Sequence, residues 1–181
     1  EEMPEMEVMR TTGKMMWSYN CSYISARPVG PNIKNMNLIA EFRTAALFAM
    51  RNGATGIGYW CYNAGRENPW GRVQFEYNLV YPGRTKPVTS RRWEAVRESI
   101  EDYRILSSLK SVLKSNDIKP ELRQRINSLL NEQLPDLVDP GFRAMKLGLS
   151  RDAIDEAYSE EKMTAFRMEM MACVREVVAW E

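Results

Sequence analysis

The spacing of apolar residues predicts a first half of the chain that alternates strands with a helix, and a second half that is helical. Residues 15–21 and 56–62 are short aromatic and apolar runs, which are typical of buried strands. Between them, apolar side chains recur three and four positions apart over residues 36–52, so we expect a helix that ends at Gly53. A strand, a helix and a strand in this order predict a right-handed parallel βαβ unit.

Helical spacing continues through residues 88–181. We expect a long helix in which Thr89 or Ser90 supplies the N-terminal cap, and a further helix with Pro120 near its start. A last long helix is predicted to begin with Ser150 as its cap. Most of the glycines, prolines and aromatic residues lie instead in residues 12–88.

The links of the βαβ unit differ in length. The helix returns to the second strand through residues 53–55 only, whereas residues 21–35 and 63–87 form long links after the two strands. Parallel α/β structures carry their functional sites at the carboxyl ends of the strands, where long loops are tolerated, so we expect a site at this edge. The side chains expected there are aromatic or carry an amide: Tyr19, Asn20, Trp60, Tyr62, Asn63 and Trp70.

Aromatic rings beside amides suit a carbohydrate. The apolar C–H face of a sugar packs on a ring, while the sugar hydroxyls need directional hydrogen bonds. Strand alternation places Trp60 and Tyr62 on one side of the second strand, and Trp17 and Tyr19 on one side of the first. The competing interpretation is that the same aromatic residues fill a core.

The remaining candidates at this edge also have two interpretations. Asn20 and Asn63 would bind sugar hydroxyls, but asparagine is a common turn former at strand ends. Trp70 fits either a mobile lid over the site or an apolar plug of its own loop. Glu67 and Glu76, in the long second loop, are expected to be the only carboxylates able to reach this edge.

The composition excludes several kinds of active site. The chain has 181 residues and no histidine, which rules out histidine-assisted serine or cysteine catalysis and histidine-bound zinc or iron within it. The three cysteines, Cys21, Cys61 and Cys173, are too few for a four-thiolate zinc site, and we expect them to be small core or pocket residues. We therefore expect neither a metal nor another cofactor.

Charge and hydropathy limit the classes of binding partner that we expect. The chain carries 25 Lys and Arg against 24 Asp and Glu, with no single-sign block, so we expect neither nucleic acid nor an anionic membrane as a partner. No apolar run reaches the roughly 18 to 20 residues that a membrane-spanning helix needs. A hydrophobic content of 44% and a charged content of 27% are ordinary for a globular domain.

Five segments occur in an order that resembles a known bacterial catalytic domain. They read Trp-Ser-Tyr-Asn-Cys at 17–21, Gly-Ile-Gly-Tyr-Trp-Cys-Tyr-Asn at 56–63, Leu-Val-Tyr-Pro-Gly at 79–83, Ser-Arg-Arg-Trp-Glu-Ala-Val-Arg at 90–97 and Ile-Glu-Asp-Tyr-Arg-Ile-Leu at 100–106. In this order they resemble domain-of-unknown-function family 4091, which is similar to the catalytic domain of glycoside hydrolase family 123. The resemblance extends over residues 14–109.

The resemblance implies an α/β fold of the (β/α)8 TIM-barrel type. Residues 1–114 would form the last two strand-helix units of that barrel, and residues 115–181 a helical extension. Because two parallel strands cannot close a barrel, the preceding units would lie before residue 1, and the chain is expected to be a fragment or to need the remainder of the barrel as a partner. For the full-length protein an extracellular or periplasmic location is expected.

The resemblance also implies which active-site residues this chain would supply and which it would not. The family's acid and its neighbouring carboxylate resemble the Asp-Glu dyad of hexosaminidases, in which the substrate's own acetamido oxygen attacks the anomeric carbon. No such pair follows a strand here, since Asp155 and Glu156 lie in the last predicted helix and Glu101 and Asp102 match a helical motif. We therefore expect sugar-binding aromatic residues but no catalytic residue, and an inactive chain when it stands alone.

Arg91 and Arg92 lie in the first turn of a predicted helix, where a cation meets the positive end of the helix dipole. Pairing with nearby carboxylates, such as Arg91 with Glu94, would offset this cost. The functional interpretation is that Arg92, the position that matches the family, helps to fix the loops of the site. The alternative for the whole chain is a noncatalytic carbohydrate-binding module, or a helical interaction module built around residues 115–181.

Overall fold

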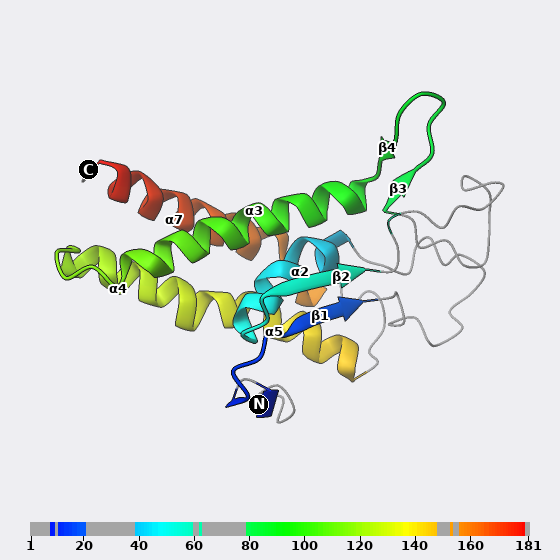
Figure 1. Cartoon of the computed structure of the whole chain (residues 1–181). Coiled ribbons are helices and arrows are strands. Elements are labelled where there is room, and N and C mark those ends of the chain that lie inside the picture. The colour runs from blue at the N-terminus through cyan, green and yellow to red at the C-terminus, as the bar shows by residue number, and fades with distance from the viewer. Residues whose placement is uncertain are drawn as a thin grey trace. The chain divides into compact units, whose positions relative to one another are not determined.

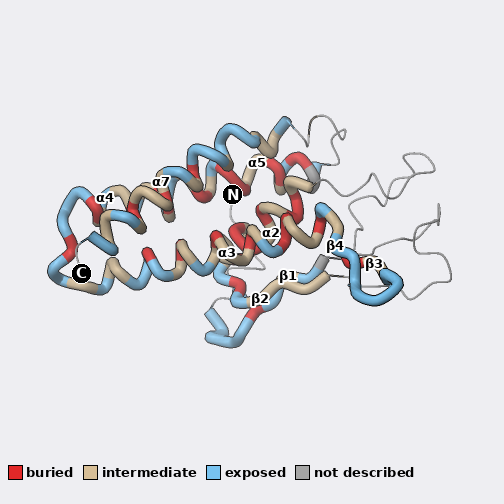
Figure 2. Tube along the Cα trace, turned by 90° about the horizontal axis from the view of Figure 1, so that it is seen from above, coloured by how far each residue is buried: buried red, intermediate tan, exposed pale blue. Residues whose placement is uncertain are grey.

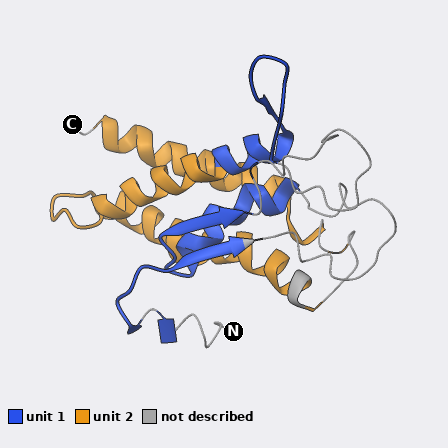
Figure 3. Cartoon of the chain, turned by 45° about the vertical axis from the view of Figure 1, so that its right-hand side comes forward, with its two compact units in different colours: residues 1–98 blue, residues 99–181 orange. Residues whose placement is uncertain are grey.

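The computed structural model describes residues 8–9, 11–20, 39–59, 62, 79–147, 153 and 156–179. The chain folds as two compact units, unit 1 with residues 1–98 and unit 2 with residues 99–181 (Figure 3). The boundary between them lies within helix α3 (Arg91–Val112), so residues 91–98 of this helix belong to unit 1. The family resemblance implies a different boundary, between a barrel part at residues 1–114 and a helical extension at residues 115–181. That boundary stays a prediction.

Unit 1 is built on a parallel βαβ arrangement, as the sequence predicts. Strand β1 (Trp17–Asn20) pairs in parallel with β2 (Gly56–Tyr59), and helix α2 (Ile39–Arg51) lies between them in the chain. In Figure 1, α2 starts near the arrowheads of β1 and β2 and runs back alongside them. The first turn of α2 therefore lies at the edge where the strands end.

The C-terminus of α2 sets the start of β2. Gly53 has a φ of 74°, and its N–H donates to the Met50 carbonyl at 3.0 Å, while Ala54 N–H donates to the Ala49 carbonyl at 2.8 Å. This pair of bonds is a Schellman motif, in which glycine takes the left-handed conformation without strain. The next N–H, of Thr55, donates to the Met16 carbonyl at 2.8 Å and brings the chain alongside β1.

The two faces of the sheet have different surroundings. Met16 and Ile57 pack with Ala49 and Ala54 on the side of α2. On the same side, the ring of Tyr59 lies 5.4 Å from that of Phe42, between centroids. Because side chains alternate along a strand, the residues between these point to the opposite face. They are Trp17 and Tyr19 on β1, and Gly56 and Gly58 on β2.

Unit 1 also contains a short hairpin that leads into α3. Strands β3 (Val80–Tyr81) and β4 (Val88–Thr89) pair antiparallel. Ser90 then caps α3, because its hydroxyl oxygen accepts the Trp93 N–H at 3.1 Å. Of the two caps that the sequence allowed, the structure therefore selects Ser90.

Unit 2 is helical. After the remainder of α3 come α4 (Pro120–Ser128), the π-helical segment η3 (Leu129–Gln133), α5 (Leu134–Lys146) and α7 (Glu160–Val178). In η3 the Leu134 N–H donates to the Leu129 carbonyl, five residues back. Pro135 follows directly and has no N–H for an ordinary helical bond, so the wider turn accommodates the proline without ending the helix.

The core of unit 2 consists of aliphatic side chains, which recur at helical intervals along the buried sides of its helices (Figure 2). The buried residues of α4, η3 and α5 include Leu122, Ile126, Leu129 and Leu137. Other fully buried side chains are Leu106, Leu109, Leu134, Val138, Phe166, Met170 and Cys173.

Two predicted boundaries need correction. The last long helix begins after Ser159, not after Ser150, because Ser159 has extended backbone and its hydroxyl oxygen accepts the Lys162 N–H at 3.2 Å. The strands are shorter than the apolar runs that predicted them, and Tyr62 lies in a bend beyond β2. Apolar pattern alone does not show where the backbone changes direction. The chain is a mixed α/β protein that is mostly helical, and its described strands form no closed barrel.

Candidate functional site

The most distinctive surface of unit 1 is the sheet face that α2 does not cover. Trp17 and Tyr19 project from it with 68% and 59% of their surface exposed. Each lies opposite a glycine, Trp17 opposite Gly56 and Tyr19 opposite Gly58. We call these two rings and two glycines the aromatic face.

The glycines let the rings lie across β2. A Cβ atom at Gly56 would be 2.7 Å from two ring atoms of Trp17, and one at Gly58 would be 3.2 Å from the ring of Tyr19. Side chains at both positions would therefore displace the rings. The two rings emerge about 6.6 Å apart along β1, the rise of two strand residues. The result is an exposed surface formed by two aromatic rings.

Tyr62 lies past the carboxyl end of β2, and 52% of its surface is exposed. Its ring meets that of Trp93 edge to face, with 5.6 Å between centroids and 84° between planes. Its carbonyl oxygen accepts the N–H of Val80 at 2.9 Å. Tyr62 is thus held through both its backbone and its ring. Nothing in the sequence pattern indicated this contact, because Tyr62 and Trp93 lie 31 residues apart in the chain.

Other predicted site residues fall partly or wholly outside the described residues. Asn20 is the last residue of β1 and lies opposite Tyr59 in register. Trp60, Asn63 and Trp70 lie outside the described residues, so their predicted roles stay predictions.

Arg92 is buried in the first turn of α3, with 9% of its surface exposed. Glu94, which we expected to pair with Arg91, has another partner. Glu94 accepts a hydrogen bond from Arg97 Nε at 2.9 Å, which is the main cause that lowers the pKa of Glu94. Glu98 pairs with Arg43 of α2 at 3.0 Å. Pairing across helices depends on which faces meet, and sequence spacing does not show this.

A carboxylate that sequence reasoning missed lies at the strand-end edge of unit 1. Glu41 is in the first turn of α2 and is buried, with 6% of its surface exposed. Glu67 and Glu76, the carboxylates that were expected to be able to reach the edge, lie outside the described residues. The only sequence signal for Glu41 was its place at the start of a helix that follows a strand.

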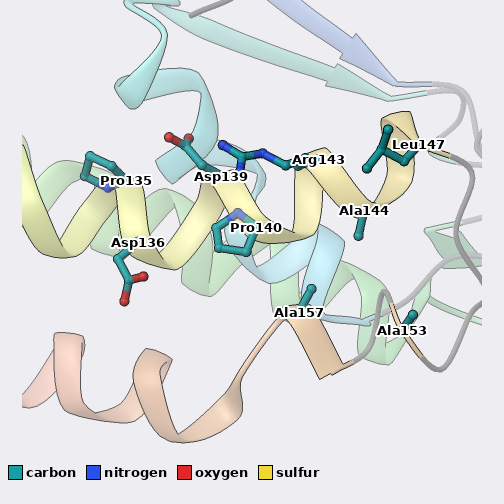
Figure 4. Close-up of a pocket in the computed structure, with 9 residues that line it drawn as sticks. All are labelled: Pro135, Asp136, Asp139, Pro140, Arg143, Ala144, Leu147, Ala153 and Ala157. Carbon is teal, nitrogen blue, oxygen red and sulfur yellow. The ribbon is translucent and has the colours of Figure 1, made fainter. Parts of the chain in front are cut away.

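Unit 2 contains an open groove of about 510 Å3 along α5. Its lining is largely apolar, with three charged side chains: Pro135, Asp136, Asp139, Pro140, Arg143, Ala144, Leu147, Ala153 and Ala157. Figure 4 shows Asp136 pointing toward α7, where it accepts a hydrogen bond from Lys162 Nζ at 2.7 Å. Among the described residues that line the groove, none is aromatic.

The charged cluster between α4 and α7 is structural. Arg125 donates to Glu169 at 2.7 Å and to Glu176 at 2.8 Å. The hydrogen bond from Arg125 lowers the pKa of Glu169 and raises the pKa of Arg125 itself. Burial raises the pKa of the Cys173 thiol to about 11, so this cysteine is protonated at neutral pH. Cys173 is therefore a core residue, as predicted, and not an activated nucleophile.

Within the described residues, no group of three or more histidine, cysteine, aspartate or glutamate side chains is placed to hold a metal ion. Nor is any described helix long and apolar enough to cross a membrane.

Residues 2–109 match the family model described as glycoside hydrolase 123, catalytic domain. The match includes all of β1, α2, β2, the hairpin and most of α3, and it ends before α4. No curated protein is significantly similar to the chain. The narrower placements, in domain-of-unknown-function family 4091 and at the C-terminal part of the family domain, stay predictions. Because the match spans more than half of the sequence, the chain belongs to the family of the glycoside hydrolase 123 catalytic domain.

Proposed function

We propose that this chain forms part of the sugar-binding wall of a hexosaminidase-like glycoside hydrolase domain and does not supply the catalytic carboxylates. The observation that carries the proposal is the aromatic face, where Trp17 and Tyr19 stay exposed although each ring is closely fitted over a glycine. Exposed aromatic rings of this size are costly in water unless a partner or a ligand covers them.

The proposed setting is a (β/α)8 barrel in which α2 belongs to the outer helical layer and the aromatic face points inward. Within the described residues β1 and β2 pair only with each other, which leaves the outer edge of each without a strand. Further parallel strands, from the remainder of the barrel, would satisfy these edges. Trp17, near the start of β1, would then contact the barrel interior, and Tyr19 would lie closer to the mouth.

The proposed sugar subsite is at the carboxyl ends of the strands. Tyr19 and Tyr62 would contact the sugar, together with Trp60, Asn20, Asn63 and Trp70 as further predicted contacts. Buried Arg92, at the start of α3, would help to fix the neighbouring loops. The substrate class that suits apolar rings beside amides is an N-acetylhexosamine, whose acetamido group would assist the reaction.

The reacting carboxylates of such a mechanism would come from another strand. In this chain β1 ends in Asn20 and β2 in Tyr59, so neither strand ends in an acid. An acid that protonates the leaving oxygen and a carboxylate that orients the acetamido group are both needed for substrate-assisted hydrolysis. The proposed contribution of this chain is therefore substrate binding and orientation, which lower the barrier by holding the sugar in place.

Titration with N-acetylgalactosamine and N-acetylglucosamine, followed by NMR of the isotope-labelled chain, tests the proposal. We expect shifts at Tyr19 and Tyr62 that saturate, and Tyr19→Ala should weaken binding by about five- to tenfold. Met15→Ala is the matched control, because Met15 is exposed just before β1. Absence of any saturable shift would remove the sugar-binding role.

A noncatalytic carbohydrate-binding role is the second candidate, favoured by the same aromatic face. The two roles differ in one expected result. For the noncatalytic role we expect no hydrolysis of an aryl N-acetylhexosaminide, even when the chain is joined to any segment that precedes it in its gene. Hydrolysis by that longer protein, lost on removal of residues 1–109, would favour the glycoside hydrolase role.

A further inference from the structure

We infer that Trp93 and Ser90 are positioning residues that hold Tyr62 as a rigid, outward-facing contact for the apolar face of a sugar, an inference that rests on the function proposed above. Tyr62 lies three positions past the end of β2, at the edge proposed for the sugar. Neither Trp93 nor Ser90 touches the proposed subsite in this role. Both act through Tyr62.

The ring of Tyr62 contacts Trp93, and about half of the surface of Tyr62 is exposed. Trp93 meets it edge to face, at 84° and 5.6 Å between centroids. Aromatic quadrupoles favour this geometry. Since 52% of Tyr62 stays exposed, part of the residue remains available to a ligand. A tyrosine held in this way keeps a contact surface that a free side chain would have to order on binding.

The hydroxyl of Ser90 links Trp93, which contacts the Tyr62 ring, to the backbone segment that contacts the Tyr62 carbonyl. It accepts the Trp93 N–H at 3.1 Å and donates to the Leu79 carbonyl at 2.5 Å. The next residue, Val80, donates its N–H to the Tyr62 carbonyl at 2.9 Å. These contacts form a closed circuit that runs from Tyr62 through Val80, Leu79, Ser90 and Trp93 and back to the Tyr62 ring.

The circuit is anchored in the core of unit 1. Leu79 and Val80 are both buried, so the backbone that holds Tyr62 is itself fixed by packing. Ser90 is the residue on which both halves of the circuit depend, because one hydroxyl serves α3 and the hairpin together. Preorganisation of this kind favours binding by reducing the ordering that a ligand must impose.

The test is a double-mutant cycle on sugar affinity in the full 181-residue chain, with N-acetylgalactosamine as the probe. We expect Trp93→Ala to weaken binding about two- to tenfold, and Trp93→Phe, which keeps a ring, to restore most of the loss. In a Tyr62→Ala background, Trp93→Ala should cause no further loss, because Trp93 acts through Tyr62. A merely structural role for Trp93 would give a further loss there.

Ser90→Ala should weaken binding in the same direction. Its matched control is Ser159→Ala, which removes the corresponding cap of α7 without any link to Tyr62. If Trp93→Ala fails to fold by circular dichroism, the comparison of Ser90→Ala with Ser159→Ala decides.

Three results would overturn the inference. Wild-type affinity in Trp93→Ala and Ser90→Ala would overturn it and leave the proposed function standing. Equal losses in Ser90→Ala and Ser159→Ala would do the same. A wild-type chain that binds no N-acetylhexosamine would overturn the proposed function, and the inference with it.

Discussion

The two units of the chain differ in the large apolar side chains that they expose. Unit 1 exposes two aromatic rings on one face of its sheet, whereas the exposed large apolar residues described in unit 2 are not aromatic: Leu147, Met168 and Val178. Unit 2 buries apolar residues from each of its helices and pairs charges such as Arg125 with Glu169 at its surface. Unit 1 covers one face of its sheet with α2 and leaves Trp17 and Tyr19 exposed on the other. The helices of unit 2 bury its core, whereas the aromatic face of unit 1 stays exposed within the described residues. For this reason we place the proposed site in unit 1.

The largest expected effect comes from the core of unit 2. Leu122→Ala should lower the free energy of unfolding by about 2 to 5 kcal/mol, because it removes a buried side chain and leaves a cavity. Urea unfolding followed by circular dichroism measures this loss. Trp17→Ala, which removes a larger side chain that is mostly exposed, should lower the free energy of unfolding far less. Equal losses in the two variants would break the contrast between the units.

An intermediate effect is expected where the aromatic face meets its glycines. Gly56→Ala should destabilise unit 1 by about 1 to 3 kcal/mol, because the new Cβ would crowd the ring of Trp17. Gly58→Ala should cost less, since its Cβ would lie 3.2 Å from Tyr19 and a small shift of the ring relieves the contact.

The control for this crowding is the double variant Trp17→Ala with Gly56→Ala. The loss from Gly56→Ala should largely vanish when the ring is absent, as thermal unfolding of the four proteins of the cycle would show. An undiminished loss would mean that Gly56 is needed for its backbone and not for the ring.

The smallest effect concerns the surface charges of unit 2. The hydrogen bond from Arg125 lowers the pKa of Glu169 from its ordinary 4.5, so the folded state favours the ionised carboxylate. The stabilisation is therefore present above about pH 4.5 and is lost as the pH falls through the lowered pKa. Because both side chains are about one-third exposed, we expect less than about 1 kcal/mol.

Glu169→Gln measures this contribution. The difference in unfolding midpoint between the wild type and this variant should be present at pH 7 and should shrink toward pH 3. Glu160→Gln is the control, since Glu160 lies exposed in the first turn of α7. A difference between wild type and Glu169→Gln that grows with acidity would contradict the proposed pairing.

Patterns of neighbouring residues were sufficient to predict the strand-helix-strand arrangement of unit 1. Two apolar runs around one helical stripe predicted the parallel pairing of β1 and β2, and Gly53 predicted the end of α2. Tyr19 was predicted to lie on the first strand and is exposed there. These features depend on residues close in sequence or on strand alternation, which a pattern records directly.

Other features depend on segments far apart in the chain. The role of Gly56 and Gly58 follows from register, since each lies opposite a ring on β1. The support of Tyr62 by Trp93, and the pairing of Glu98 with Arg43, require that α3 meet other elements on particular faces. The start of α7 at Ser159 depended on a backbone bend within a continuous helical pattern.

The sequence by itself determined the order of the elements, the absence of histidine chemistry and the concentration of aromatic residues near two strand ends. Only the tertiary structure decided which face of the sheet α2 covers, and therefore which aromatic residues remain open to a partner or a sugar. The physical reason is that periodicity specifies which side chains share a face, whereas burial depends on what is packed against that face.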